Sequence, residues 1–180
     1  MTSWNHSWKS ILWTVLLTVL GVACFPVNPL VLSGLIETEH YPVLYLLGWI
    51  SWTLGMLLIM APIIMFPRKG GVEKGKSFVH TSRLVETGIY GVVRHPQYLG
   101  GMLALFVTTF LWYPHLLFGV LGVAGIVSVY MSCREEDGEL IGKFGNGYRE
   151  YMARVPRVNI ILGVVRYVQR KGEDRNEHND

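Results

Sequence analysis

The chain has 180 residues, of which 51% are hydrophobic and only 16% are charged, whereas an ordinary soluble domain carries about 25% charged residues. Lys and Arg together outnumber Asp and Glu by 16 to 13. The charges are unevenly distributed, since residues 10–36, 40–67 and 95–133 contain no Asp, Glu, Lys or Arg. This pattern excludes an ordinary soluble domain and indicates an integral membrane protein, because a helix needs roughly 20 apolar residues to cross a bilayer.

The three charge-free segments predict four membrane helices, because the last segment is long enough for two short helices and is interrupted at Pro114. The aromatic residues beside this proline, Trp112 and Tyr113, are typical of a membrane–water interface. We therefore predict an all-α, polytopic membrane protein with a cytoplasmic helical cap at its C-terminal end. The four predicted membrane helices cover residues 10–33, 43–66, 97–112 and 116–132.

The positions of the basic residues predict the orientation of these helices. Every Lys and Arg lies before the first predicted helix, between the second and the third, or after the fourth. Because basic loops stay on the cytoplasmic side, we expect both chain termini in the cytoplasm, at the cell membrane of a prokaryote or the endoplasmic reticulum of a eukaryote. The basic charge is then explained by the lipid bilayer, and we predict no nucleic-acid partner.

Two local patterns predict how the third and fourth helices begin and pack. Pro96 suits the first turn of a helix, where its missing N–H group costs nothing. Gly119, Gly122 and Gly125 recur every three residues in the fourth helix, and small residues at such spacing allow a neighbouring helix to approach closely.

The sequence after the fourth membrane helix predicts the C-terminal cap. Apolar residues at helical spacing continue after Glu139 and are interrupted at 145–147, where the sequence reads Gly-Asn-Gly. Residues 158–168 are apolar but too few to cross a bilayer, so we expect them to dock on the protein or on the membrane surface. Residues 171–180 are predicted to form a polar, disordered tail, and residues 1–170 a single domain.

Two polar clusters flank the third and fourth predicted membrane helices. The first, residues 88–98, contains an Arg-His-Pro sequence that starts at Arg94, and the second begins with the acidic residues at 135–137. Taken separately, each cluster also has a purely structural explanation: a proline starts a helix, and an arginine or tyrosine often lies at the interface. The acidic residues need cationic partners because negative charge is mildly unfavourable at a helix C-terminus; Arg134, Arg94 or a bound cation would serve.

The chain lacks the motifs of several common enzyme classes. It has no Gly-x-Gly-x-x-Gly after a strand, no His-Glu-x-x-His, no Cys-x-x-Cys and no phosphate-binding P-loop. We therefore predict no metal site, and we expect any cofactor to be held by helices and loops at the face of the membrane.

The two clusters together form one longer pattern. Its first part reads Leu84-Val85-x-x-Gly88-x-Tyr90-x-x-x-Arg94-His95-Pro96-x-Tyr98, and its second part reads Glu136-Asp137-x-x-Leu140-x-x-x-Phe144-Gly145-x-x-Tyr148-x-x-Tyr151-x-x-x-Val155-Pro156. This pattern resembles the isoprenylcysteine carboxyl methyltransferase family. It also resembles the broader set of membrane methyltransferases that includes the phospholipid N-methyltransferases. The similarity extends over residues 84–156, less than half of the chain.

The resemblance implies S-adenosylmethionine as the methyl donor, bound by about residues 80–157. It implies a cofactor pocket lined by Leu84, Val85, Tyr90, His95, Pro96, Gln97, Tyr98 and Glu136. Glu136 is then expected to pair with the ammonium group and His95 or backbone N–H groups with the carboxylate, while the tyrosines pack on the adenine or near the sulfonium. The family usually has two glutamates where this chain has Glu136 and Asp137, which leaves the role of Asp137 open.

The acceptor decides which side chains catalyse the reaction. A carboxylate acceptor is already ionised and needs only a cation, Arg134 or Arg94, whereas an amine arrives protonated and needs a base, Glu135 or Glu136. Our first expectation is carboxyl O-methylation of a lipid-soluble or prenylated, isoprenylcysteine-like molecule. The alternatives are N-methylation of a phospholipid and S-methylation of a small thiol. A sterol-type reductase that uses NADPH and a non-catalytic membrane scaffold are alternatives from other classes.

Overall fold

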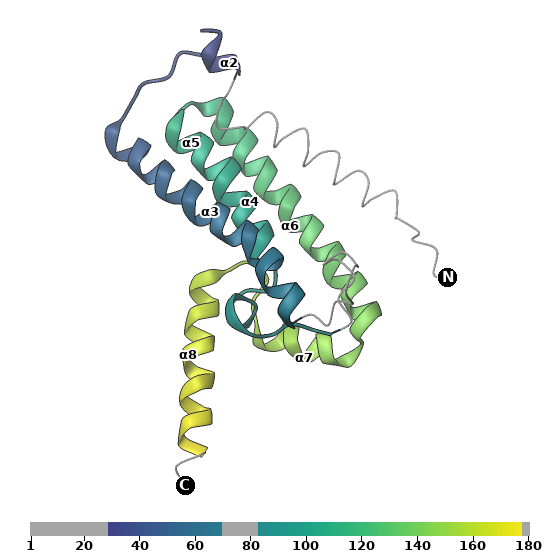
Figure 1. Cartoon of the computed structure of the whole chain (residues 1–180). Coiled ribbons are helices and arrows are strands. Elements are labelled where there is room, and N and C mark those ends of the chain that lie inside the picture. The colour runs from purple at the N-terminus through teal and green to yellow at the C-terminus, as the bar shows by residue number, and fades with distance from the viewer. Residues whose placement is uncertain (1–28, 70–82, 178–180) are drawn as a thin grey trace. The chain divides into compact units, whose positions relative to one another are not determined.

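The computed structural model describes residues 29–69 and 83–177, and all regular secondary structure in these ranges is helical. The prediction of an all-α fold is confirmed for this part of the chain. The helices are α2 (Pro29–Leu32), α3 (Pro42–Lys69), the 3₁₀ helix η1 (Gly88–Gly91), α4 (Pro96–Gly101), the π-helix η2 (Met102–Val107), α5 (Thr108–Trp112), α6 (Leu116–Phe144), α7 (Asn146–Arg154) and α8 (Ile160–Glu177) (Figure 1).

The described residues form two compact units. Within the described ranges, the first unit comprises residues 29–58 and 98–136, and the second unit comprises residues 59–69, 83–97 and 137–177. The helices α3 and α6 each contribute residues to both units.

Two helices in the described ranges, α3 over Pro42–Met65 and α6 over Leu116–Phe144, are long and apolar enough to cross a membrane. The first predicted membrane helix, residues 10–33, lies outside the described residues except for its last few, which include α2. The third is found as one helical run through α4, η2 and α5. The fourth does not end at residue 132 as predicted, because its charged continuation contains no helix-breaking proline and remains helical to Phe144.

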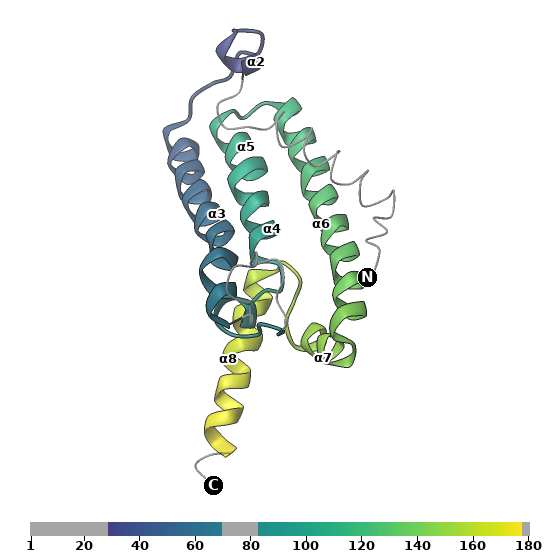
Figure 2. The same cartoon turned by 45° about the vertical axis from the view of Figure 1, so that its right-hand side comes forward.

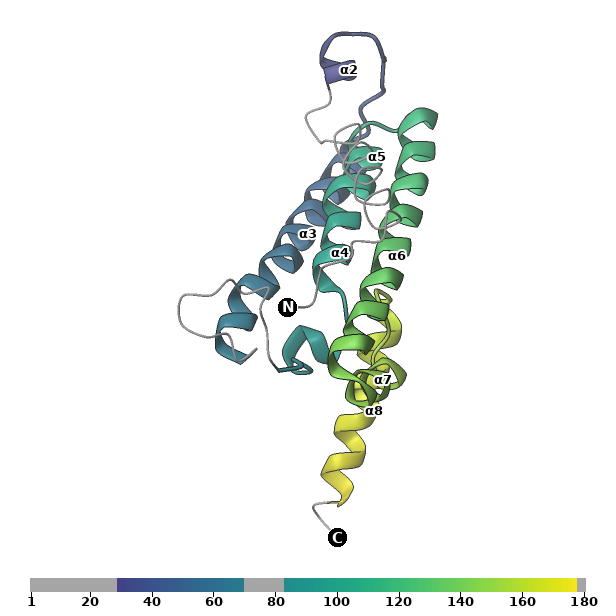
Figure 3. The ribbon, with the colours of Figure 1, turned by 90° about the vertical axis from the view of Figure 1, so that its right-hand side faces the viewer.

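Glycines allow close helix packing in the first unit. The run through η2 and α5 lies between α3 and α6 (Figures 2 and 3). A Cβ atom added to Gly125 of α6 would lie 2.3 Å from the ring of Phe106, and one added to Gly55 of α3 would lie 2.6 Å from the carbonyl oxygen of Gly100. Side chains of normal size cannot approach so closely. The predicted close packing is confirmed at Gly125, whereas a Cβ atom on Gly119 or Gly122 would make ordinary contacts at 3.4 and 3.6 Å.

The π-helix interrupts the α-helical run with wider turns, and hydroxyl groups satisfy its carbonyls. The carbonyl oxygen of Leu103 accepts from the N–H of Thr108, five residues later, and also from the hydroxyls of Thr108 at 2.8 Å and Ser51 at 3.0 Å. Ser51 belongs to α3. The irregular turn is therefore also held by a hydrogen bond from a neighbouring helix.

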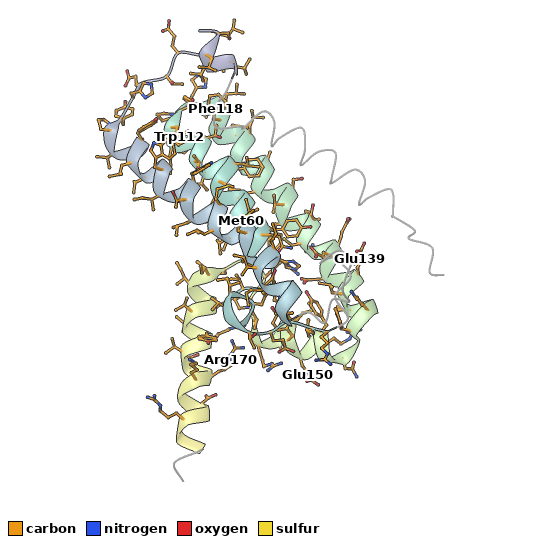
Figure 4. The ribbon with its side chains drawn as sticks, in the orientation of Figure 1. Met60, Trp112, Phe118, Glu139, Glu150 and Arg170 are labelled. Carbon is orange, nitrogen blue, oxygen red and sulfur yellow. The ribbon has the colours of Figure 1, made fainter. Side chains whose placement is uncertain are left out.

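Aromatic side chains gather near the connection between α5 and α6 in the first unit. Trp112 packs on Tyr45 and Trp49 of α3, with ring centroids 5.6 and 4.8 Å apart. Phe118, at the start of α6, is fully buried, and Figure 4 labels it beside Trp112. Both lie close to the interruption at Pro114 that the sequence predicted between the two helices.

The second unit has a small core of its own. Its most buried apolar residues are Tyr148, Tyr151 and Val155, and partly buried side chains of Leu84, Leu140, Ile141, Phe144 and Met152 pack against them. The helix α6 ends at Gly145, which has a φ of +61°, a conformation that glycine adopts without strain. The predicted interruption at 145–147 is thereby confirmed, and α7 turns back so that its two tyrosines face the core.

One face of α8 docks on the loop that carries η1. A Cβ atom on Gly163 would lie 2.1 Å from the carbonyl oxygen of Val92, and Arg170 donates to the carbonyl oxygen of Gly91 at 2.7 Å. This contact agrees with the expectation that residues 158–168 dock on the protein or on the membrane surface. The helix continues to Glu177, so residues 171–177, expected to be a disordered tail, are helical.

Candidate functional site

The centre of the second unit is the buried carboxylate of Asp137, which accepts four hydrogen bonds from side chains. Its Oδ1 atom accepts from Arg94 Nη1 at 2.8 Å, from His95 Nε2 at 2.9 Å and from the Tyr148 hydroxyl at 2.6 Å. Its Oδ2 atom accepts from Arg157 Nε at 2.7 Å. The cluster joins α6, the loop before α4, α7 and the segment after α7.

Backbone hydrogen bonds fix the Arg-His-Pro loop beside the segment that follows α7. The N–H groups of Arg94 and His95 donate to the carbonyl oxygens of Pro156 and Arg157 at 3.0 and 3.1 Å. Pro96 has no N–H to donate and begins α4 as predicted. These backbone hydrogen bonds alone hold two segments that are far apart in the sequence side by side.

The loop is also fastened at η1. The hydroxyl of Tyr151 donates to the carbonyl oxygen of Tyr90 at 2.7 Å. At the surface, Arg154 forms an ion pair of 2.7 Å with Glu86. Exposed pairs of this kind contribute about 0–1 kcal/mol, so we attribute the fixed position of the loop to the buried hydrogen bonds.

The buried charges of Asp137 and Arg94 are paired with each other. The side chains of Asp137 and Arg94 are 3% and 6% exposed, and a buried ion pair survives only where further hydrogen bonds satisfy its remaining atoms. Arg157 and His95 supply those bonds. Burial, and then the hydrogen bond to Asp137, raise the pKa of the Tyr148 hydroxyl, so it stays protonated and keeps donating.

One donor of the cluster has no partner among the described residues. The Nε atom of Arg94 is buried and makes no hydrogen bond there. An unsatisfied buried polar group costs about 1–3 kcal/mol, so such a donor suits an anionic group that binds from outside the protein. No group of three or more His, Cys, Asp and Glu in the described ranges is arranged to hold a metal ion.

The comparison with protein families decides the class of the chain. Residues 43–146, which are 104 of the 180 residues, match the family described as phospholipid methyltransferase. The chain belongs to this family. The match confirms the broader of the two resemblances predicted from the sequence and the expectation of a methyltransferase family. The narrower likeness to the isoprenylcysteine carboxyl methyltransferases stays a prediction.

Two curated proteins are similar to this phospholipid methyltransferase family member. The methanethiol S-methyltransferase of Pseudomonas deceptionensis is 26% identical over 118 residues, which are 63% of this chain and 43% of that protein. The methanethiol S-methyltransferase 2 of Bradyrhizobium diazoefficiens is 34% identical over 87 residues, which are 48% of this chain and 31% of that protein. The chain thus covers less than half of either relative, and no solved structure matches it significantly.

Most of the site residues that were predicted for this protein belong to the second unit. Tyr90, His95 and Pro96 are buried there, and the Tyr90 hydroxyl donates to Gln97 Oε1 at 3.3 Å. The structure brings together the following predicted residues in this unit: Leu84, Val85, Tyr90, Arg94, His95, Pro96 and Gln97.

The remaining predicted residues lie on the helical hairpin of the first unit: Tyr98, Arg134, Glu135 and Glu136. Tyr98 precedes Trp112 by 14 residues and Glu136 follows Leu116 by 20 residues. At about 1.5 Å per residue, both lie roughly 20–30 Å from the connection between the antiparallel helices, at the same end of the hairpin. Arg134 is exposed, and Glu135 and Glu136 are partly buried. Their roles in binding and catalysis stay predictions.

Three members of the cluster were not among the site residues predicted from the sequence: Asp137, Tyr148 and Arg157. Asp137 and Tyr148 were visible in the pattern that carried the resemblance, and Arg157 directly follows its last residue. The need of the acidic residues for a cation was also recognised, and Arg94 is indeed the partner of Asp137. No spacing in the sequence, however, indicated that one carboxylate would accept hydrogen bonds from four side chains.

Proposed function

We propose that this protein transfers a methyl group from S-adenosylmethionine to a thiol at the surface of a membrane. Membership of the phospholipid methyltransferase family supports methyl transfer, and the two helices long enough to cross a bilayer support the membrane. The observation that carries the choice of a thiol is that both curated relatives are named methanethiol S-methyltransferases. Neither name refers to a carboxyl acceptor, so carboxyl O-methylation, our first expectation from the sequence, has less support.

The residues of the second unit fit the chemistry of the proposed methyl donor. S-adenosylmethionine carries a carboxylate, and the buried Nε of Arg94 is a donor without a partner among the described residues. Tyr90 and Gln97, joined by a hydrogen bond, offer an aromatic ring and an amide to a purine. When bound, this cofactor supplies an activated methyl group on a positively charged sulfur atom.

Asp137 acts in this proposal as a positioning residue. Its carboxylate is surrounded by four donors, two of which are guanidinium groups, so it has little capacity to take up a proton. It instead holds Arg94 and His95 in fixed positions. Fixed positions matter because methyl transfer is an in-line displacement, whose rate depends on how the reacting atoms are placed.

The acceptor sulfur has to lose its proton, because the thiolate is the nucleophile. Positive charge lowers the pKa of a nearby thiol, and Arg94 and Arg157 supply such charge in the second unit. For the other acceptors the predictions stay as before: Glu135 or Glu136 as the base for an amine, and Arg134 or Arg94 as the cation for a carboxylate. The new carbon–sulfur bond forms as the carbon–sulfur bond of the sulfonium breaks, and one proton is released.

A transfer assay with the purified full chain in lipid nanodiscs tests the proposal. The methyl group of S-adenosylmethionine is isotopically labelled, and methanethiol, phosphatidylethanolamine and a prenylated cysteine acid are offered in parallel. We expect label in the thiol product. The Asp137→Asn protein and a reaction without protein are the controls.

Phospholipid N-methylation is the second candidate, favoured by the description of the family. Label that enters phosphatidylethanolamine and not the thiol would establish this second function and overturn the first. Label in a base-labile ester of the prenylated acid would support the carboxyl acceptor instead. Binding of S-adenosylmethionine without transfer to any thiol would also contradict the thiol proposal.

A further inference from the structure

The helix α8 exposes an apolar stripe on the side turned away from the protein. Ile161 is 77% exposed, Val168 is 63% exposed, and Val164 and Val165 are both about half exposed. Their spacing of three and four residues places them on one helical face. The opposite face carries Gly163 and docks on the loop of η1, so the exposed stripe does not serve to hold α8 on the protein.

The contacts of η1 place the start of α8 near the end of a candidate membrane span. On α3, the span covers Pro42–Met65, and the terminal methyl of Met65 lies 2.6 Å from where a Cβ atom on Gly88 would stand. On α8, a Cβ atom on Gly163 would lie 2.1 Å from the carbonyl oxygen of Val92. Since Gly88 and Val92 are four residues apart in one tight turn, both helices meet the same short segment. The first turns of α8 therefore lie at the depth where the apolar part of α3 ends.

The composition of α8 changes along its length at this depth. Residues 160–168 contain eight apolar or glycine residues and a single Arg, whereas residues 169–177 contain Arg170, Lys171, Glu173, Asp174, Arg175 and Glu177. An apolar first half followed by a charged second half suits a helix that starts in the interfacial layer of a bilayer and continues into water.

We propose that the stripe formed by Ile161, Val164, Val165 and Val168 lies against lipid, in the boundary between headgroups and acyl chains. This inference rests on the membrane placement in the proposed function. A lipid surface fits the stripe better than a second copy of the chain, because stable protein interfaces use about 20–30 residues on each side, and this stripe offers four.

A fluorescent label on single cysteines tests the position of the stripe. In a background with Cys24→Ser and Cys133→Ser, bimane is attached through Val165→Cys on the stripe, Glu173→Cys on the charged half or Leu57→Cys on the exposed side of α3. Each full-length protein is reconstituted into phosphatidylcholine vesicles, with or without brominated acyl chains, and its monodispersity is checked beforehand. We expect brominated lipid to quench the labels at positions 165 and 57, and aqueous iodide to quench the label at 173.

The controls separate this inference from the membrane placement on which it rests. If the label at 57 is quenched by brominated lipid while that at 165 responds only to iodide, the inference is overturned and the membrane placement stands. If neither label responds to lipid, both fail. If emission at 165 depends on the protein density in the vesicle and not on brominated lipid, a second copy covers the stripe, and the lipid assignment is wrong.

Discussion

Arg157 donates from Nε to Oδ2 of Asp137 at 2.7 Å, which fastens the segment after α7 to the last turns of α6. The other carboxylate oxygen of Asp137 is occupied by donors from the Arg-His-Pro loop and from α7. A single side chain therefore joins the two polar clusters that flank the helical hairpin in the sequence. Its removal should affect both at once.

Asp137→Asn should be strongly destabilising. The substitution removes the charge that balances the buried Arg94, and breaking a buried ion pair costs about 3–5 kcal/mol. Thermal unfolding in detergent measures the effect, and titration with S-adenosylmethionine should show weakened binding in the protein that remains folded. Asp137→Glu keeps the charge and should retain more stability. Glu139→Gln, an exposed acid of the same helix, is the matched control, and an equal loss in this variant would contradict the special role of Asp137.

The two buried tyrosines predict a loss of stability in alkali. Burial raises the pKa of Tyr148 and of Tyr151 above the ordinary value of 10.0. Above pH 10, the unfolded chain releases these protons while the folded protein keeps them. The unfolded state then binds fewer protons, so the free energy of unfolding falls as pH rises; below pH 10 the contribution is fully present. Melting temperatures between about pH 9 and 11 should fall less steeply in Tyr148→Phe/Tyr151→Phe than in the wild type. If the melting temperatures of the two proteins fall equally steeply with pH, the two hydroxyls are not buried as described.

Gly163→Ala should loosen the docking of α8. The added methyl group would lie 2.1 Å from the carbonyl oxygen of Val92, a backbone atom that cannot rotate away. Overpacking of this kind typically costs 1–3 kcal/mol, and hydrogen exchange should quicken in residues 160–177. Gly172→Ala is the control on the same helix, since a Cβ atom there meets nothing within 4 Å. Unchanged protection in the Gly163 variant would argue against the docked position of α8.

Gly125→Ala should disturb the packing of α6 in the first unit. Its Cβ atom would lie 2.3 Å from the ring of Phe106, which is 1% exposed and has little space to move. We expect a loss of about 1–3 kcal/mol, measured as a lower unfolding temperature in detergent. Gly138→Ala on the same helix meets nothing within 4 Å and should be neutral or slightly stabilising, because alanine favours helices more than glycine does. Equal unfolding temperatures of the two variants would contradict the close approach at Gly125.

The parts of the fold that follow from local patterns were predictable from the sequence. Charge-free runs indicated α3 and the hairpin, Pro96 indicated the start of α4, and the repeated glycines indicated close packing of α6. The end of α6 was not predictable in this way. The loss of apolar character after residue 132 indicates where a bilayer ends, but a helix ends only where its backbone geometry changes, here at Gly145.

The candidate site was predictable only in part, for a physical reason. The Arg-His-Pro sequence and the acidic cluster stood out by their residue types, and the resemblance linked them to one family. The bonds to Asp137 join residues that are 43, 42, 20 and 11 positions away. Such non-local pairing depends on how the helices pack against one another, and local residue types and spacing do not reveal that packing.

The π-helix between Met102 and Val107 also affects how the sequences of related chains should be aligned with this one. A π turn contains more residues than an α turn of the same helix, so a relative with a regular helix here would reach the same depth with fewer residues. We therefore expect deletions within 102–107 to be tolerated where insertions are not. Positions in such a relative are best aligned with this chain in two separate parts, one that runs forward from Pro96 and one that runs backward from Thr108.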